Sequence, residues 1–214
     1  MKIQIIILSL LVFSSCDNVG RFEVPQPEEQ RDEKSIPKKL WGIYLNLEDS
    51  SMITIGKGQI VKIVKTSYSG LLSDLDSADR VVIKGDTIFS EVDANLAIDI
   101  VTKGDSIFQN MNYADTLFSF SNDNILRKFK GYYFLNKKTG LGTWSVTKLG
   151  ITKDGIVLGR ISNKEDLEKL RELTNAKADT VYNFRPTKKQ LWQFVKDKGF
   201  QNEVRFVKIE YGRQ

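Results

Sequence analysis

The 214-residue sequence contains no histidine and one cysteine, Cys16. Without an imidazole base, Ser-His-Asp and Cys-His catalysis are excluded. The usual Cys/His zinc sites are also excluded, and a single cysteine cannot form a disulfide within the chain. Carboxylate pairs, Ser-Lys pairs and hard-metal sites of Asp and Glu stay open. Because no catalytic motif or metal-ligand spacing is found for them, we expect a protein that is not an enzyme and uses no metal or cofactor.

Long hydrophobic runs are equally scarce. The most apolar segment, residues 3–13, has about eleven residues and spans roughly 16 Å as a helix, about half of a bilayer core. It is too short for a transmembrane helix and has the length of the apolar part of a secretory signal. Lys2 precedes it, and Ser14, Ser15 and Cys16 follow it.

This order of basic start, apolar core, two small residues and cysteine resembles the signal of bacterial lipoproteins. The resemblance covers residues 1–16. It implies that residues 1–15 are a signal peptide, that Cys16 carries a diacylglycerol on its sulfur, and that the new amino terminus is acylated, for example with palmitate. Two or three acyl chains hold a protein durably to a membrane. An ordinary secretory signal with a chance cysteine is the alternative.

A bacterial lipoprotein resides in the cell envelope, which sets its partners. The membrane is then a partner through the lipid on Cys16, while the choice between periplasmic face and cell surface stays open. Residues 125–214 carry 20 Lys/Arg against 9 Asp/Glu, so this half is strongly basic. Such a surface suits anionic headgroups or an acidic protein, or merely keeps the chain soluble. Nucleic acid is not an expected partner of an exported chain.

Residues 16–39 predict a flexible tether after the lipidated cysteine. Pro25, Pro27 and Pro37 interrupt helix and strand, and charged residues outnumber apolar ones. A linker of about 20 residues has an r.m.s. span of roughly 25 Å. Residues 40–214 are then expected to form a single β-rich globular domain.

Short runs rich in β-branched and aromatic residues predict strands from residue 40 onward, separated by turns. A small repeat marks several of these turns: KGDTIF at Lys84, KGDSIF at Lys103, YADTLF at Tyr113 and KADTVY at Lys177. Gly or Ala with Asp makes the turn, and the following residues begin a strand. The spacing favours an antiparallel meander or barrel-like sheet.

Two helices are predicted in the C-terminal part, at about 163–175 and 187–198. In the first, Ser162 is expected to cap the amino end and Glu165 to complete a capping box. In the second, Thr187 caps and Gly199 closes the helix. The fold class is therefore mainly β with a small α+β C-terminal part.

Aromatic residues are the best candidates for a binding site. Trp41, Gly42 and Tyr44 resemble the opening of lipocalin-type barrels, which implies an apolar interior for a small hydrophobic molecule. The same aromatics can equally fill an ordinary core. In the second helix, an exposed aromatic beside lysines would suit a partner surface. The ligand- or partner-binding candidates are Trp41, Tyr44, Phe120, Tyr132, Trp144, Trp192 and Phe194.

Together these features predict a membrane-anchored envelope lipoprotein that acts as a non-catalytic binding module. Its expected partner is an envelope protein, or a small apolar or glycan ligand. The alternative is a carboxylate-dependent enzyme acting on envelope glycans, which requires two acids about 5–9 Å apart across a cleft.

Overall fold

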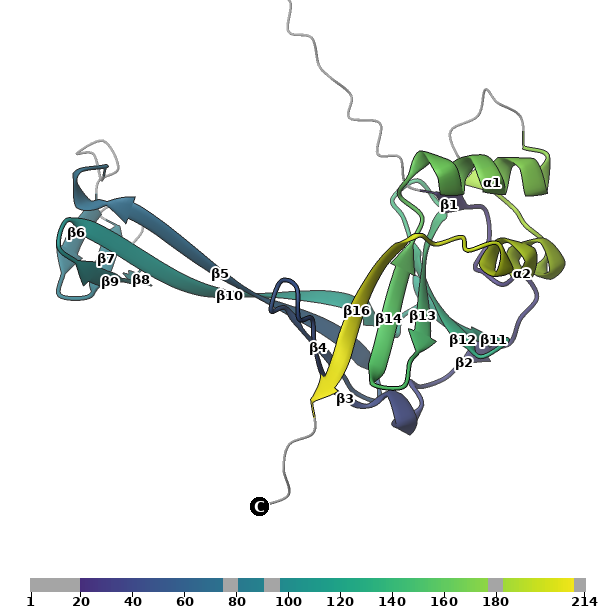
Figure 1. Cartoon of the computed structure of the whole chain (residues 1–214), viewed down its shortest axis with the longest axis horizontal. Coiled ribbons are helices and arrows are strands. Elements are labelled where there is room, and N and C mark those ends of the chain that lie inside the picture. The colour runs from purple at the N-terminus through teal and green to yellow at the C-terminus, as the bar shows by residue number, and fades with distance from the viewer. Residues whose placement is uncertain (1–19, 75–80, 91–96, 177–182, 210–214) are drawn as a thin grey trace, which may run out of the picture.

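The computed structural model describes residues 20–74, 81–90, 97–176 and 183–209. These residues form a body from which a long two-stranded arm projects, with a small sheet at its far end (Figure 1). Antiparallel strands dominate, and two helices follow them, α1 (Lys164–Thr174) and α2 (Lys188–Lys196). The predicted fold class, mainly β with a small α+β C-terminal part, is confirmed.

Most strands belong to one large sheet. Its members are β1 (Arg21–Phe22), β2 (Asp32–Glu33), β3 (Gly42–Leu45), β4 (Met52–Ile55), β5 (Gln59–Leu71), β9 (Val101–Lys103), β10 (Ser106–Ser119), β11 (Asn124–Phe129), β12 (Tyr132–Lys138), β13 (Trp144–Ile151), β14 (Gly155–Arg160), β15 (Asn183–Phe184) and β16 (Asn202–Ile209). A separate small sheet contains β6 (Val81–Lys84), β7 (Thr87–Ser90) and β8 (Ala97–Asp99). Two short 3₁₀ turns, Lys38–Leu40 and Leu72–Asp74, complete the described elements.

The large sheet is open. Its strands run in the order β2-β11-β12-β13-β14-β16-β3-β4-β5-β10-β9, and β1 and β15 attach beside β13. Among the described strands, the two ends of this order, β2 and β9, do not pair with each other. The sheet is therefore not a closed barrel, and the interior that the lipocalin-like start implied is not enclosed by strands.

Of the three described copies of the repeated turn sequence, the two that contain glycine form a turn. Gly85 separates β6 from β7 and Gly104 separates β9 from β10, both with positive φ (62° and 59°). YADTLF instead lies within β10, where the pairing with β5 shifts register between Thr116 and Phe118, so the turn predicted there is wrong. Ala114 stands where glycine would be, and an alanine does not readily adopt the positive φ that the turn needs. The KADTVY copy at 177–182 lies outside the described residues.

Both predicted helices are present, but the first cap differs from the prediction. Asn163, not Ser162, caps α1: its Oδ1 accepts a hydrogen bond from Asp166 N at 2.7 Å. Ser162 Oγ instead accepts one from Asn202 Nδ2 at 2.7 Å and joins the helix entry to β16. The predicted Thr187 cap of α2 is confirmed, and Gln190 completes a capping box with it. Beyond α2, Gly199 N–H bonds to Phe194 O at 2.9 Å and closes the helix.

The sheet carries a hydrophobic core on each face, because alternate residues of a strand point to opposite sides. On β12, Tyr133 and Leu135 belong to the first core, which is formed by side chains from strands of the sheet itself, such as Ile53 of β4 and Leu158 of β14. Phe134 belongs to the second core, which also contains Leu170 of α1 and Phe194 of α2. Both helices thus cover one face of the body (Figure 1).

Residues 20–36 pack against the body, and we call this segment the strap. The prediction of a flexible tether is wrong for this part of residues 16–39. Phe22 is fully buried in the second core and Ile36 is buried in the first. β1 pairs with both β13 and β15, and β2 pairs with β11. Phe22 and Ile36 each stand among polar and charged residues in the sequence, so the local composition does not indicate that they are buried.

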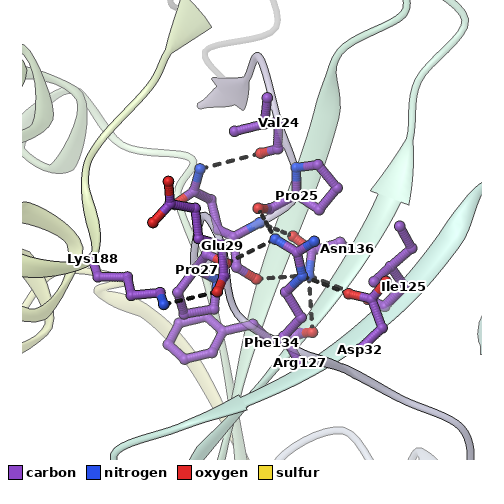
Figure 2. A network of polar contacts seen from close by, with 11 residues as sticks. Val24, Pro25, Pro27, Glu29, Asp32, Ile125, Arg127, Phe134, Asn136 and Lys188 are labelled. Atoms are coloured by element: carbon purple, nitrogen blue, oxygen red, sulfur yellow. Dashed lines mark hydrogen bonds and ion pairs between the residues drawn. The ribbon is translucent and has the colours of Figure 1, made fainter.

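Two side chains of the body hold the strap by its backbone (Figure 2). Asn136 is fully buried; its Oδ1 accepts from Gln26 N at 2.6 Å and its Nδ2 donates to Gln26 O at 2.8 Å. Arg127 Nη1 donates to the carbonyl oxygens of Pro25 and Pro27 at 2.5 and 2.8 Å. These bonds satisfy strap groups that have no strand partner, which explains how a proline-interrupted segment can stay ordered.

Candidate functional site

The seven aromatic candidates do not form one site. Trp41, Tyr44 and Phe120 belong to or border the first core. Tyr44 is buried and donates its hydroxyl to Leu40 O at 2.8 Å, and burial raises its pKa. Trp41 is half-buried and its Nε1 donates to Ile36 O at 2.8 Å. These bonds lie within the body and serve the packing of its own segments.

The other four candidates, Tyr132, Trp144, Trp192 and Phe194, belong to or border the second core, on the opposite face. Phe194 is fully buried. Trp192 is half-buried beside Phe129 and Tyr132, with ring centroids 6.3 and 6.5 Å away. The structure therefore brings the seven together only as members of two cores. Cys16, the predicted lipidation site, lies outside the described residues.

The arm is the most distinctive surface feature of the chain. It is formed by β5 and β10, which pair antiparallel from Gln59↔Ser119 to Leu71↔Ser106. Beyond the body, each cross-strand pair of one face contains a large apolar side chain. These pairs are Val64↔Tyr113, Thr66↔Met111 and Tyr68↔Gln109. We call this side the apolar face of the arm.

The opposite side of the arm is polar at its centre, where Lys65 pairs with Asn112 and Ser67 with Asn110, and Ser67 Oγ bonds to Asn110 Oδ1 at 2.7 Å. Apolar residues lie on this side only toward the body, in Ile63↔Ala114, and toward the tip, in Ser69↔Phe108 and Leu71↔Ser106. The apolar face, by contrast, leaves large side chains in solvent: Tyr113 is 64% exposed and Tyr68 56%. Contiguous exposed apolar surface on a soluble protein marks an interaction site.

The middle of the arm also has two open strand edges. β4 pairs with β5 only over Ile60–Ile63, and β9 pairs with β10 only over Ser106–Phe108. Between these limits, no other described strand pairs with the outer edge of either strand. A bare two-stranded ribbon is marginally stable in water, and open edges readily pair with another chain.

A cavity lies at each end of the apolar face. At the body, a cavity of about 290 Å³ is lined by Val64 and Tyr113 of the arm together with residues of β14 and β16, among them Val204. At the tip, a cavity of about 350 Å³ lies between Tyr68 and Ile107 of the arm and the small β6-β7-β8 sheet. The apolar face thus continues from the body to the tip sheet.

Two further cavities of about 420 Å³ each open on the body. One lies between β10, β13 and the end of β14, and is lined by Asp115, Lys137 and Arg160 among others. The second lies beside Tyr44 and the β13–β14 turn, and contains Asp154. None of the four cavities is lined by two carboxylates. Within the described ranges, no group of three or more His, Cys, Asp or Glu could hold a metal ion.

One carboxylate, Asp166, is fully buried. Its Oδ2 accepts a hydrogen bond from Gln201 N at 2.8 Å and so ties the first turn of α1 to the start of β16. Burial raises the pKa of Asp166, and the Gln201 amide and the charge of Lys169 offset only part of this effect. Asp166 lines none of the four cavities. Asp166 therefore has a structural role, which is to hold α1 against the start of β16.

The raised pKa predicts a pH-dependent stability. Folded Asp166 binds its proton more tightly than the unfolded chain does, so its contribution to the free energy of unfolding falls as pH rises above 3.8 through the folded pKa. Asp166→Asn does not titrate. Urea unfolding at about pH 4 and about pH 7 should show wild type losing stability relative to the variant on going to neutral pH. A stability difference independent of pH would contradict the raised pKa.

Sequence reasoning missed the arm, although part of its signal is present. Val64, Thr66 and Tyr68 alternate with polar residues, and so do Met111 and Tyr113. This alternation indicates a sheet with one apolar face. Nothing in the pattern tells whether another element covers that face.

No helix in the described part of the chain is long and apolar enough to cross a membrane.

No model of a known protein family matches the sequence, and searches of curated proteins and of solved structures find no significant match to it.

Proposed function

We propose that this chain is a lipid-anchored protein of the bacterial envelope that works without catalysis, by binding another envelope protein along its arm. The observation that carries the binding role is the exposed apolar face on a ribbon whose edges are open. The anchor rests on the signal-like segment that ends at Cys16.

The geometry favours a protein partner over a small ligand. The apolar face extends along the whole projecting arm, between a cavity at the body and another at the tip. An added strand could bond to the open edge of β10 while its side chains pack beside Met111 and Tyr113. Such pairing would also stabilise the ribbon itself, since a third strand supports an isolated hairpin.

The alternative, a carboxylate-dependent glycan enzyme, has less support. It requires two acids facing each other across a cleft. The cavities described above contain Asp115 or Asp154 singly, and the tip cavity contains no acid.

Photo-cross-linking in cells tests the docking face. Benzoylphenylalanine placed at Tyr113 should form a covalent adduct with one envelope protein, which mass spectrometry identifies. The matched control is the same group at Lys65, an exposed neighbour on the polar side of the arm. Equal adducts at both positions, or none at Tyr113, would contradict the proposal.

A substitution then tests whether the captured protein binds this face. Met111→Lys should weaken its copurification by about tenfold or more, the loss expected for a central contact worth about 1.4 kcal/mol. Asn112→Lys adds the same charge on the opposite side and should leave binding nearly unchanged. If both variants bind alike, the apolar face is not the docking surface.

A further inference from the structure

The point where the chain enters the body is fixed. Gly20 N donates to Ile161 O at 3.1 Å. The next residues pair with β13, Arg21 with Ser145 and Phe22 with Trp144. A Cβ on Gly20 would lie 2.6 Å from Ile161 Cγ2, so the backbone at Gly20 is closely packed. The strap is therefore fixed to the body from Gly20 onward, and Cys16 precedes this point closely in the sequence.

The length of the connection from Cys16 to Gly20 limits where a lipid on Cys16 can hold the body. Three residues, Asp17 to Val19, lie between Cys16 and Gly20, so four Cα-to-Cα steps join them and span at most about 14 Å when fully extended. The predicted tether of residues 16–39 would have spanned roughly 25 Å on average. With the strap bound, a lipid on Cys16 must hold the surface around Gly20 close to the membrane.

The end of β13 that pairs with β1 has the residue types that a membrane interface favours. The turn between β12 and β13 precedes Trp144, the partner of Phe22, and its Leu141 is 69% exposed. Lys137 and Lys138 lead into this turn, and Lys138 lies 3.7 Å from Asp123. An exposed apolar residue flanked by lysines can enter the headgroup region while the ammonium groups meet lipid phosphates.

A second cation, Arg160, lines the same cavity as Gly20. This cavity of about 420 Å³ is also lined by Lys137 and Asp115. Lys137 and Arg160 form no ion pair with any residue that the structure describes. Asp115 is the single carboxylate among the residues lining this cavity.

We infer that this end of the body, the anchor end, rests on the bilayer, with Leu141 in the interface and Lys137 and Arg160 against lipid phosphates. The inference rests on the proposed lipid anchor. It also orients the docking surface: β5 and β10 leave the body across the direction of β13, β14 and β16 (Figure 1), so the arm extends along the membrane. The partner would then be a protein that lies at the same membrane.

The single native cysteine makes a sharp test possible, because lipid on Cys16 consumes its thiol. The full chain is lipidated in cells, purified, and placed on vesicles of phosphatidylethanolamine and phosphatidylglycerol that contain spin-labelled lipid. Leu141→Cys carries an environment-sensitive fluorophore at the anchor end. Lys153→Cys carries it in the exposed turn at the other end of β13. Quenching should be several-fold stronger at position 141, and equal quenching would overturn the inference.

Two further measurements separate this inference from the anchor itself. Lipidated chains, shown by labelled palmitate, that are not quenched at position 141 overturn only the orientation; chains without label overturn the anchor and the orientation together. Inserting a Gly/Ser linker of about 20 residues between Asp17 and Gly20 should reduce the quenching several-fold, because it lengthens the connection to roughly 25 Å. Unchanged quenching would mean that the short connection does not hold the body down.

Discussion

Replacing Gly155 with alanine is expected to lower the free energy of unfolding by about 3 kcal/mol, the upper part of the range for overpacked cores. Gly155 begins β14 and pairs with Val207 of β16. An added Cβ would lie 2.0 Å from the carbonyl oxygen of Phe206, a backbone atom that cannot move without shifting the strand. The two strands would have to separate at the centre of the sheet.

Thermal or urea unfolding measures the effect of Gly155→Ala. For a chain of this size, about 3 kcal/mol corresponds to a decrease in Tm of roughly 6–12 °C. Gly58→Ala is the matched control, because a Cβ there meets nothing within 4 Å. The control should stay within about 0.5 kcal/mol of wild type. A Gly155→Ala protein as stable as the control would show that β14 and β16 are not packed as described.

The second large effect is expected from Asn136→Ala, also by about 3 kcal/mol. The substitution leaves the N–H and the C=O of buried Gln26 without their partner, and each unsatisfied buried group costs about 1–3 kcal/mol. Hydrogen exchange should accelerate most over the strap. Because the strap sets the length of the connection to Cys16, its release would also lengthen the connection between the body and the proposed anchor.

Asn110→Ala is the control for this experiment. Asn110 is exposed on the polar side of the arm, and its side chain accepts only a surface hydrogen bond from Ser67. The free energy of unfolding of the Asn110→Ala protein should match that of wild type within about 0.5 kcal/mol, and hydrogen exchange in its strap should be as slow as in wild type. Equal exchange of the strap in both variants would mean that Asn136 does not hold it.

The sequence predicted the regular elements well because their signals are local. Alternating strands, the Thr187 capping box and the glycine turns at Gly85 and Gly104 each follow from residues within a few positions of one another. The wrong turn at YADTLF also came from a local pattern. The segment resembles the two glycine turns, but it has Ala114 in place of glycine, and alanine does not readily adopt positive φ. The cap of α1 is Asn163 and not the predicted Ser162, because the Ser162 hydroxyl accepts a hydrogen bond from Asn202 instead.

The strap and the arm could not be predicted in the same way, because distant residues decide both. The strap has few apolar residues, and its backbone is held by Arg127 and Asn136, about a hundred positions away. The alternation in β5 and β10 does show an apolar face. Whether that face is covered depends on where the rest of the sheet ends. The seven aromatic candidates were chosen by residue type, which does not distinguish a core from a site.

The mass of the mature protein, purified from bacterial membranes, tests the central claim most directly. If the chain is a lipid-anchored envelope protein, its amino-terminal residue is Cys16, and the mass exceeds that of residues 16–214 by a diacylglyceryl group and an acyl chain. A mature chain that keeps residues 1–15, or that has an unmodified Cys16, would contradict the claim.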